Sequence, residues 1–258
     1  MTAFFNEERN QVTLMKLAVR KRKIGIIPVL EVVDQDQLYT PLPLIVYYHG
    51  WQTSKELVLT QGRKLAQQGF RVVLPDAQNH GEREAPMSQV PSLTFLQSIY
   101  TNLFEFESIV DYFTQLGLDN GRLGVGGVSM GGMTTCALLT QHPEIDVAAC
   151  VMGSPSLIDY RKQLEESFKK RKISLPQDYE NLTSWIPYYD LALHYGEIKK
   201  RPLFFWHGIH DEKVQFVQTD RFVRKNLGPE ITFHAANERH MVKVPTMDQV
   251  TDFFVNHL

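Results

Sequence analysis

A serine between two glycines, at the spacing G-x-S-x-G, most constrains what this chain can fold into. Gly127, Ser129 and Gly131 lie in RLGVGGVSMGG, where an apolar run ends at about Gly126 and a helix is expected to begin near the serine. The pattern is typical of a sharp strand-to-helix turn, in which a side chain at either glycine would collide with the neighbouring strand and helix. The sequence therefore predicts a nucleophilic serine hydroxyl that projects from the end of a sheet.

Apolar runs and amphipathic stretches alternate on both sides of this motif, an order that indicates an α/β fold with a parallel sheet. Partly alternating residues between Val12 and Asp34 indicate an antiparallel hairpin whose turn lies at Arg20–Lys23. Thr53 and Glu56 have the spacing of a capping box, and Gly69 would end the helix that they begin. The buried strands are expected at 44–50, 70–75, 147–153, 202–208 and 231–236, and helices at 53–68, 98–116, 214–227 and 246–257.

The alternation is interrupted between Ser154 and Arg201, a segment longer than a crossover between parallel strands requires. We expect a single domain spanning residues 1–258 with this segment inserted as a small helical cap. The first part of the cap is a charged, solvated helix and the second is rich in aromatic residues. Trp185, Tyr188 and Tyr189 either line a substrate pocket or only attach the cap to the body, in which case the loop from Glu82 to Tyr100 would line the pocket.

A serine hydroxyl becomes an effective nucleophile when a base accepts its proton and a third group orients that base. In this type of fold the chain order is serine, then aspartate or glutamate, then histidine. Asp211 follows directly on the expected strand 202–208, and His240 lies in the loop before the last helix. Ser129, Asp211 and His240 are therefore the predicted catalytic residues. The positions that lack this placement are Asp146, Asp159, Asp178, Asp190, Asp220, His234 and His257.

The oxyanion formed during acyl transfer needs backbone donors that are already in place. The N–H of Met130 follows the nucleophile directly, and the N–H of Trp51 follows the strand 44–50, so these two groups are the predicted oxyanion hole. The side chain of His49 is expected to stabilise that turn. His80, with Asp76, faces the same edge of the sheet and either ties its loop together or contacts substrate.

His207, His210 and Asp211 are ligand types that could bind a metal ion. The sequence has no H-E-x-x-H helix, and Asp211 is better explained as the acid that orients His240. A glycine-rich phosphate loop with a lysine is also absent. The sequence therefore predicts catalysis without a metal or another cofactor.

The 258-residue chain carries 27 basic and 29 acidic residues, a formal net charge of -2. This balance argues against binding nucleic acid or an anionic membrane and suits small, roughly neutral substrates. The start MTAFFNEERNQ lacks the pattern of a signal peptide, so we expect a cytoplasmic protein. Cys136 and Cys150 are interpreted as small core residues. Nothing in the sequence predicts an oligomeric state.

Six motifs in order, HGW, PDAQNHGER, GVSMGG, MGSP, WHGIHDEKV and ERHMV, resemble the α/β-hydrolase superfamily. They are most similar to small bacterial esterases of the prolyl-oligopeptidase and dienelactone-hydrolase branch. The resemblance implies a mostly parallel sheet of roughly eight strands with helices on both faces. It also implies Ser129 as nucleophile, Asp211 as acid, His240 as base, and Trp51 with Met130 as oxyanion donors. Dienelactone hydrolases proper carry a cysteine nucleophile, so the serine argues against that activity.

The resulting functional prediction is a serine hydrolase that cleaves small carboxylic esters through an acyl-enzyme. A serine aminopeptidase, an acyl transferase or a thioesterase could use the same three residues, because fold does not determine substrate. Large oligopeptidases of this branch carry a propeller domain that is not expected here, which favours a small ester. The remaining alternative is a ligand-binding protein that kept the fold and lost catalysis.

Overall fold

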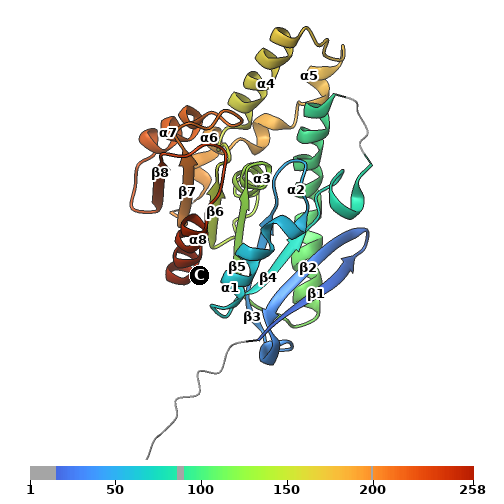
Figure 1. The fold of residues 1–258 in the computed structure, drawn as a ribbon, viewed down its shortest axis with the longest axis vertical. Coiled ribbons are helices and arrows are strands. Elements are labelled where there is room, and N and C mark those ends of the chain that lie inside the picture. The colour runs from blue at the N-terminus through green and yellow to red at the C-terminus, as the bar shows by residue number, and fades with distance from the viewer. Residues whose placement is uncertain (1–15, 86–89, 199) are drawn as a thin grey trace, which may run out of the picture.

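A computed structural model describes residues 16–85, 90–198 and 200–258. Within these residues the strands form one eight-stranded sheet in the order β1-β2-β4-β3-β5-β6-β7-β8 (Figure 1). β1 and β2 form an antiparallel hairpin that joins β4 antiparallel, and the other neighbours pair in parallel. The strands are β1 (Leu17–Ile24), β2 (Ile27–Asp34), β3 (Leu42–Tyr48), β4 (Arg71–Pro75), β5 (Asp119–Val128), β6 (Val147–Val151), β7 (Leu203–Gly208) and β8 (Ile231–Ala236).

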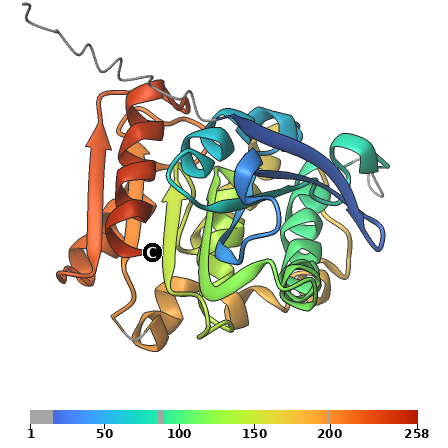
Figure 2. The ribbon, with the colours of Figure 1, turned by 90° about the horizontal axis from the view of Figure 1, so that it is seen from below.

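Helices cover both faces of the sheet (Figure 2), as predicted for this fold class. The hydrophobic core on one face includes residues of α2 (Pro91–Gln115), α3 (Met130–Leu138) and α7 (Phe216–Lys225). The core on the other face includes residues of α1 (Leu59–Ala66) and α8 (Val244–His257). Strand β3 supplies both cores because successive side chains point to opposite faces, so Tyr48 packs on the first and Tyr47 on the second.

Helix α2 buries the apolar stripe that the sequence predicted for it, and it begins earlier than predicted, at Pro91 instead of Ser98. The buried members of the stripe are Ile99, Leu103, Phe106, Ile109 and Phe113. No helix in the described part of the chain is both long enough and apolar enough to cross a bilayer.

The segment between β6 and β7 is helical and lies at one end of the sheet, near the start of α2 (Figure 1). Its ordered elements are α4 (Leu157–Arg171), α5 (Tyr179–Leu182), η4 (Ile186–Tyr189), α6 (Leu191–His194) and η5 (Tyr195–Ile198). It meets α2 through ring contacts between Phe95 and Tyr160 and between Tyr100 and Trp185, with centroids 5.1 and 4.7 Å apart.

The predicted position of the first hairpin turn was wrong. Arg20–Lys23 lies within β1, and the chain turns at Gly25, whose φ is +58°. Successive side chains of this run point to opposite faces of the strand, and those of Arg20 and Arg22 lie on the face where the neighbouring strand carries the buried carboxylate of Glu31, which pairs with Arg22 at 2.6 Å. The predicted beginning of this hairpin, at Val12, lies outside the described residues.

The predicted capping box also does not form. Thr53 donates its hydroxyl hydrogen to the carbonyl of Gly50 at 2.7 Å and so stays in the turn after β3. Glu56 accepts from the hydroxyl of Ser54 at 2.6 Å, and the chain passes through the short helix η2 (Lys55–Val58) before α1 begins. Gly69 follows α1 with a φ of +90°, which agrees with its predicted role at the helix end.

A fully buried arginine, Arg71, fastens the antiparallel edge of the sheet to the loops beside it. Its guanidinium forms an ion pair with Glu31, which is also fully buried. The same group donates to the backbone carbonyls of Gln37, Leu38, Thr40 and Leu118 at 3.0 to 3.2 Å. The buried guanidinium thus satisfies five acceptors at buried and partly buried positions.

We predict that Arg71→Met lowers the free energy of unfolding by about 3 kcal/mol or more, because Glu31 and the four carbonyls lose a buried partner. The measurement is urea unfolding followed by tryptophan fluorescence. Arg224→Met is the matched control, since Arg224 pairs with Asp220 on the exposed surface of α7 and its loss should change stability little. Equal effects of the two variants would contradict the structural role assigned to Arg71.

Candidate active site

Ser129 occupies a strained backbone turn between the end of β5 and the start of α3. Its φ and ψ are +57° and −113°, a conformation that non-glycine residues rarely adopt. The two flanking glycines allow a very close approach of the chain on either side. A Cβ at Gly127 would lie 2.5 Å from the backbone of Gly131, and a Cβ at Gly131 would lie 2.3 Å from the carbonyl oxygen of Tyr48. A side chain at either glycine would therefore collide with the backbone, as predicted.

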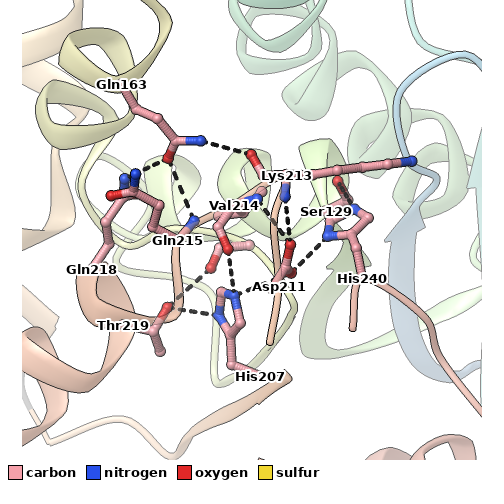
Figure 3. Close-up of polar contacts among 11 residues, drawn as sticks. Ser129, Gln163, His207, Asp211, Lys213, Val214, Gln215, Gln218, Thr219 and His240 are labelled. Carbon is pink, nitrogen blue, oxygen red and sulfur yellow. Dashed lines mark hydrogen bonds and ion pairs between the residues drawn. The ribbon is translucent and has the colours of Figure 1, made fainter. Parts of the chain in front are cut away.

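The structure brings Ser129, His240 and Asp211 into one hydrogen-bonded chain, although they lie on three different loops (Figure 3). His240 Nε2 lies 2.9 Å from Ser129 Oγ, and His240 Nδ1 lies 2.7 Å from a carboxylate oxygen of Asp211. A carboxylate can only accept, so Nδ1 carries the hydrogen and Nε2 is left to accept from the serine hydroxyl. This tautomer is the one that can remove a proton from the serine.

Several donors converge on the carboxylate of Asp211 and keep it ionised. One oxygen accepts from the backbone N–H groups of Lys213 and Val214 at 2.9 and 3.0 Å. The other lies 2.7 Å from His240 Nδ1 and 3.3 Å from His207 Nε2. Burial by itself raises the pKa of Asp211, but the hydrogen bonds from the two histidines and Val214 outweigh it and hold that pKa well below the usual range.

His207, which the sequence indicated only as a potential metal ligand, is a neighbour of Asp211. It is fully buried in β7, with Nδ1 3.0 Å from Thr219 Oγ1 and Nε2 3.0 Å from the carbonyl oxygen of Val214. His210 does not join it, because its Nε2 bonds to Asn237 on the exposed side of the loop. Among the described residues no group of three or more histidine, cysteine or acidic side chains is arranged to hold a metal ion.

The loop after β3 runs directly beside the serine. A Cβ at Gly50 would lie 3.5 Å from the Cβ of Ser129, and the next residue, Trp51, lines the same cavity as the serine. Met130 is the first residue of α3, so its N–H has no acceptor within the helix. The two backbone groups predicted as an oxyanion hole therefore lie on the segments that flank Ser129.

His49 joins the loop after β3 to the loop after β4. Its Nδ1 donates to the carbonyl of Gly50 at 2.8 Å, and its Nε2 accepts from the N–H of Ala77 at 3.0 Å. These partners require a neutral ring, and burial lowers the pKa of His49 to about 4. The side chain therefore stabilises the turn that carries Trp51.

Asp76 and His80 are also occupied by loop contacts. The buried carboxylate of Asp76 accepts from the backbone and the ammonium group of Lys55 at 2.9 and 2.6 Å, and from the N–H of Glu82 at 3.0 Å. The His80 ring packs edge-on against Trp51, with centroids 4.8 Å apart, and does not line the cavity at Ser129. Of the two interpretations of His80, the contacts favour the one in which it ties the loop together.

The cavity at Ser129 has a volume of about 240 Å³ and one aromatic side. That side is formed by Trp51, by Phe95 near the start of α2, and by Tyr160 from α4 in the cap. Phe95 belongs to the alternative wall segment, Glu82 to Tyr100. Tyr160 was missed, because it lies within a charged sequence that predicts only a solvated helix; its signal is that it lies with Leu157 and Phe168 on the buried side of that helix.

The cap aromatics predicted as possible pocket residues do not reach this cavity. Trp185 stacks on Tyr100, Tyr189 packs edge-on against Trp185, and Tyr188 is 68% exposed. Together with Gln141 and Ser184 they line a separate, open depression. The physical reason is that the second half of the cap packs on α2 and α3, whereas α4 is the part that reaches the site.

One cap side chain supports the loop that carries the acid. Gln163 of α4 donates to the carbonyl of Lys213 at 2.9 Å, and its oxygen accepts from the side-chain amide of Gln218 at 2.9 Å (Figure 3). The cap and the Asp211 loop are thus connected directly.

Comparisons with known proteins agree with this architecture. A family model for the alpha/beta hydrolase fold matches residues 43–234. The chain is 32% identical over 212 residues to "Putative esterase YitV" of Bacillus subtilis (strain 168), covering 80% of this chain and 83% of that protein. It is 27% identical over 248 residues to Esterase YjfP of Escherichia coli (strain K12), covering 94% and 100% of the two chains.

The fold is also similar to that of a solved protein, TT1662 from Thermus thermophilus. The TM-score is 0.71 at 19% sequence identity, and the match covers 94% of this chain and 98% of that one. The family match over most of the chain, the relative above 30% identity and the common fold lead to one conclusion: the chain belongs to the alpha/beta hydrolase fold family.

Proposed function

We propose that this protein is a serine esterase that cleaves small carboxylic esters through an acyl-enzyme intermediate. The observation that carries the proposal is the hydrogen-bonded chain from Ser129 Oγ through His240 to Asp211. The esterase names of the similar proteins YitV and YjfP support the same class of reaction. An intact nucleophile, base and acid in contact argue against a protein that only binds ligands.

The reaction follows from the positions of these groups. His240 Nε2 accepts the hydroxyl proton as Ser129 Oγ bonds to the carbonyl carbon, and the oxyanion accepts hydrogen bonds from the N–H groups of Trp51 and Met130. The intermediate collapses, the bond from carbon to the alcohol oxygen breaks, and His240 returns its proton to that oxygen. Water then attacks the acyl-enzyme with the same base, which releases the acid and restores Ser129. The ionised Asp211 stabilises the imidazolium in both steps.

The cavity favours an ester over an aminopeptidase substrate. An aminopeptidase must bind an ammonium group, for which a carboxylate is the usual partner. Asp or Glu does not occur among the residues found to line the cavity at Ser129, and the charged side chain there, Lys213, has the wrong sign. A thioesterase or an acyl transferase would use the same three residues, so a thioester should be compared directly with its oxygen ester.

We predict that Ser129→Ala reduces kcat/KM for p-nitrophenyl acetate by at least about 10⁴-fold, because the nucleophile is lost while the backbone donors remain. A fluorophosphonate probe should label the wild type and not the variant. Ser184→Ala, which removes an exposed serine in the cap, is the control and should behave as wild type in both assays. A Ser129→Ala protein that keeps a tenth of the activity would disprove the proposed role of this residue.

A second prediction concerns pH and the loop that carries Trp51. Free histidine takes up a proton below about pH 6.5, whereas His49 in the folded protein does so only near pH 4. Because the unfolded state binds the proton first, the stability contributed by neutral His49 is complete above pH 6.5 and is lost as the pH falls toward 4. The wild-type loss from this group should reach about 3 kcal/mol at pH 4.

The measurement is urea unfolding of wild type and of His49→Asn between pH 7 and pH 4.5. The stability advantage of wild type over His49→Asn should shrink steadily as the pH is lowered. His210→Asn, at an exposed histidine two residues past β7, is the control and should show no such convergence. A difference between wild type and His49→Asn that stays constant over this range would refute the neutral, turn-stabilising histidine.

A further inference from the structure

A second cavity, of about 260 Å³, lies next to the one at Ser129 on the α1 and α8 side of the sheet. Its walls come from η2, from the start of α1, from the ends of the central strands, from the segment after His240 and from α8. The lining residues are Tyr47, Leu57, Val58, Gln61, Val128, Val151, Met152, His240, Met241, Val242, Met247 and Val250.

The two cavities meet at the reacting groups. Both are lined by Leu57, Val128, Met152 and His240. The aromatic side formed by Trp51, Phe95 and Tyr160 belongs only to the first cavity. Ser129 therefore opens toward aromatic walls in one direction and, past His240, toward aliphatic walls in the other. An ester bound at the serine has two chains, the acyl chain and the alcohol chain, and each can extend into one of the two cavities.

The second cavity suits a flexible apolar chain. Three of its lining residues are methionines, and their unbranched side chains adapt to ligands of different shape. They are Met152, Met241 and Met247. Gln61 uses its amide hydrogens on the carbonyl of Met247 and the hydroxyl of Thr251, at 3.2 and 3.0 Å. Among the described residues that line the second cavity there is no aspartate, glutamate, lysine or arginine, so apart from His240 the lining is uncharged and suits an apolar ligand.

The position of His240 decides which arm of the ester enters. When the intermediate collapses, the alcohol oxygen must lie within reach of His240 Nε2, because that nitrogen carries the proton it receives. His240 lines both cavities, but the two residues that follow it, Met241 and Val242, line only the second, so the carbon chain beyond this oxygen is assigned to the second cavity. The proposed oxyanion donor Trp51 and the aromatic walls lie on the other side and are left for the acyl arm.

We propose that the second cavity binds the alkyl chain of the alcohol part of the substrate, so that the preferred substrates are esters of medium-length, unbranched alcohols. The inference rests on the proposed esterase function. A cavity of about 260 Å³ accepts a chain of roughly six to eight carbons, since a water-sized group occupies about 30 Å³. After the carbon–oxygen bond breaks and His240 protonates the oxygen, the alcohol leaves past Leu57 and Met241, which are 56% and 59% exposed.

Two series of alkyl esters test the assignment, with acid release followed by titration at constant pH. The first keeps an acetyl group and varies the alcohol from methyl to butyl, hexyl and octyl. The second keeps methanol and varies the acid over the same lengths. Each methylene that enters the cavity should raise kcat/KM about fourfold. We expect hexyl acetate, which has five more methylenes than methyl acetate, to exceed it by roughly 1,000-fold in kcat/KM, with a smaller rise along the acyl series.

Met247→Trp places a large ring in the second cavity from a partly exposed position on α8. It should reduce the ratio of hexyl to methyl acetate by at least about tenfold and leave the ratios in the acyl series unchanged. Val255→Trp, on the same helix but exposed and away from the cavity, is the matched control and should keep both series as in wild type. Thermal unfolding of each variant verifies that it is folded.

The assignment would be overturned if Met247→Trp removed the rise of kcat/KM with acyl chain length and kept the rise with alcohol chain length, since the cavity would then hold the acid part. Unchanged ratios in both series would overturn it as well, because the cavity would then hold no part of the substrate. Either result would leave the proposed function standing if Ser129 still reacts with the fluorophosphonate and methyl acetate is still hydrolysed. If the wild-type protein neither reacted with the fluorophosphonate at Ser129 nor hydrolysed methyl acetate, the proposed function itself would be wrong.

Discussion

The close approach of the Ser129 turn to strand β3 is the constraint on which the rest of the site depends. Only hydrogen atoms fit between Gly131 and the carbonyl of Tyr48, and between Gly127 and Gly131. This contact lets α3 begin immediately after β5 and holds Ser129 at a positive φ, a strain of order 1–3 kcal/mol that the packed surroundings must offset. The same contact places Ser129 beside the loop after β3, so Ser129 and Trp51 share one cavity.

The second requirement is a carboxylate that stays charged although its side chain is buried. Two backbone N–H groups and two histidines face Asp211, and together they outweigh the cost of removing its charge from water. The loop that presents these donors is itself held by Gln163 of the cap. The cap therefore contacts the candidate site in two places. Gln163 bonds to the loop that carries Asp211, and Tyr160 lines the cavity. In the proposed reaction, a shift of α4 would alter both the pocket wall and the orientation of His240.

The surroundings of Ser129 differ on its two sides, and this asymmetry connects the fold to the proposed selectivity. The sheet separates two hydrophobic cores, and the site lies where both reach the carboxyl ends of the strands. Aromatic residues of α2 and α4 extend from one core, and aliphatic residues of η2 and α8 extend from the other. His240 lines both cavities because the β8–α8 loop that carries it crosses this boundary. In the proposed function, the acyl and alcohol parts of an ester meet different walls, which is the proposed basis for distinguishing them.

The sequence by itself determined the parts of this protein that local rules govern. Glycine spacing around Ser129 specified the turn, uninterrupted apolar runs specified the buried strands, and the order of Ser129, Asp211 and His240 along the chain placed each beyond the end of a strand. Only the tertiary structure decided which side chains and elements pack against one another. The basic run at Arg20–Lys23 lies in a strand that pairs with the strand carrying the buried Glu31. Trp185 packed on α2, whereas Tyr160 reached the cavity. These outcomes depend on contacts between residues far apart in sequence, whose energies no local pattern contains.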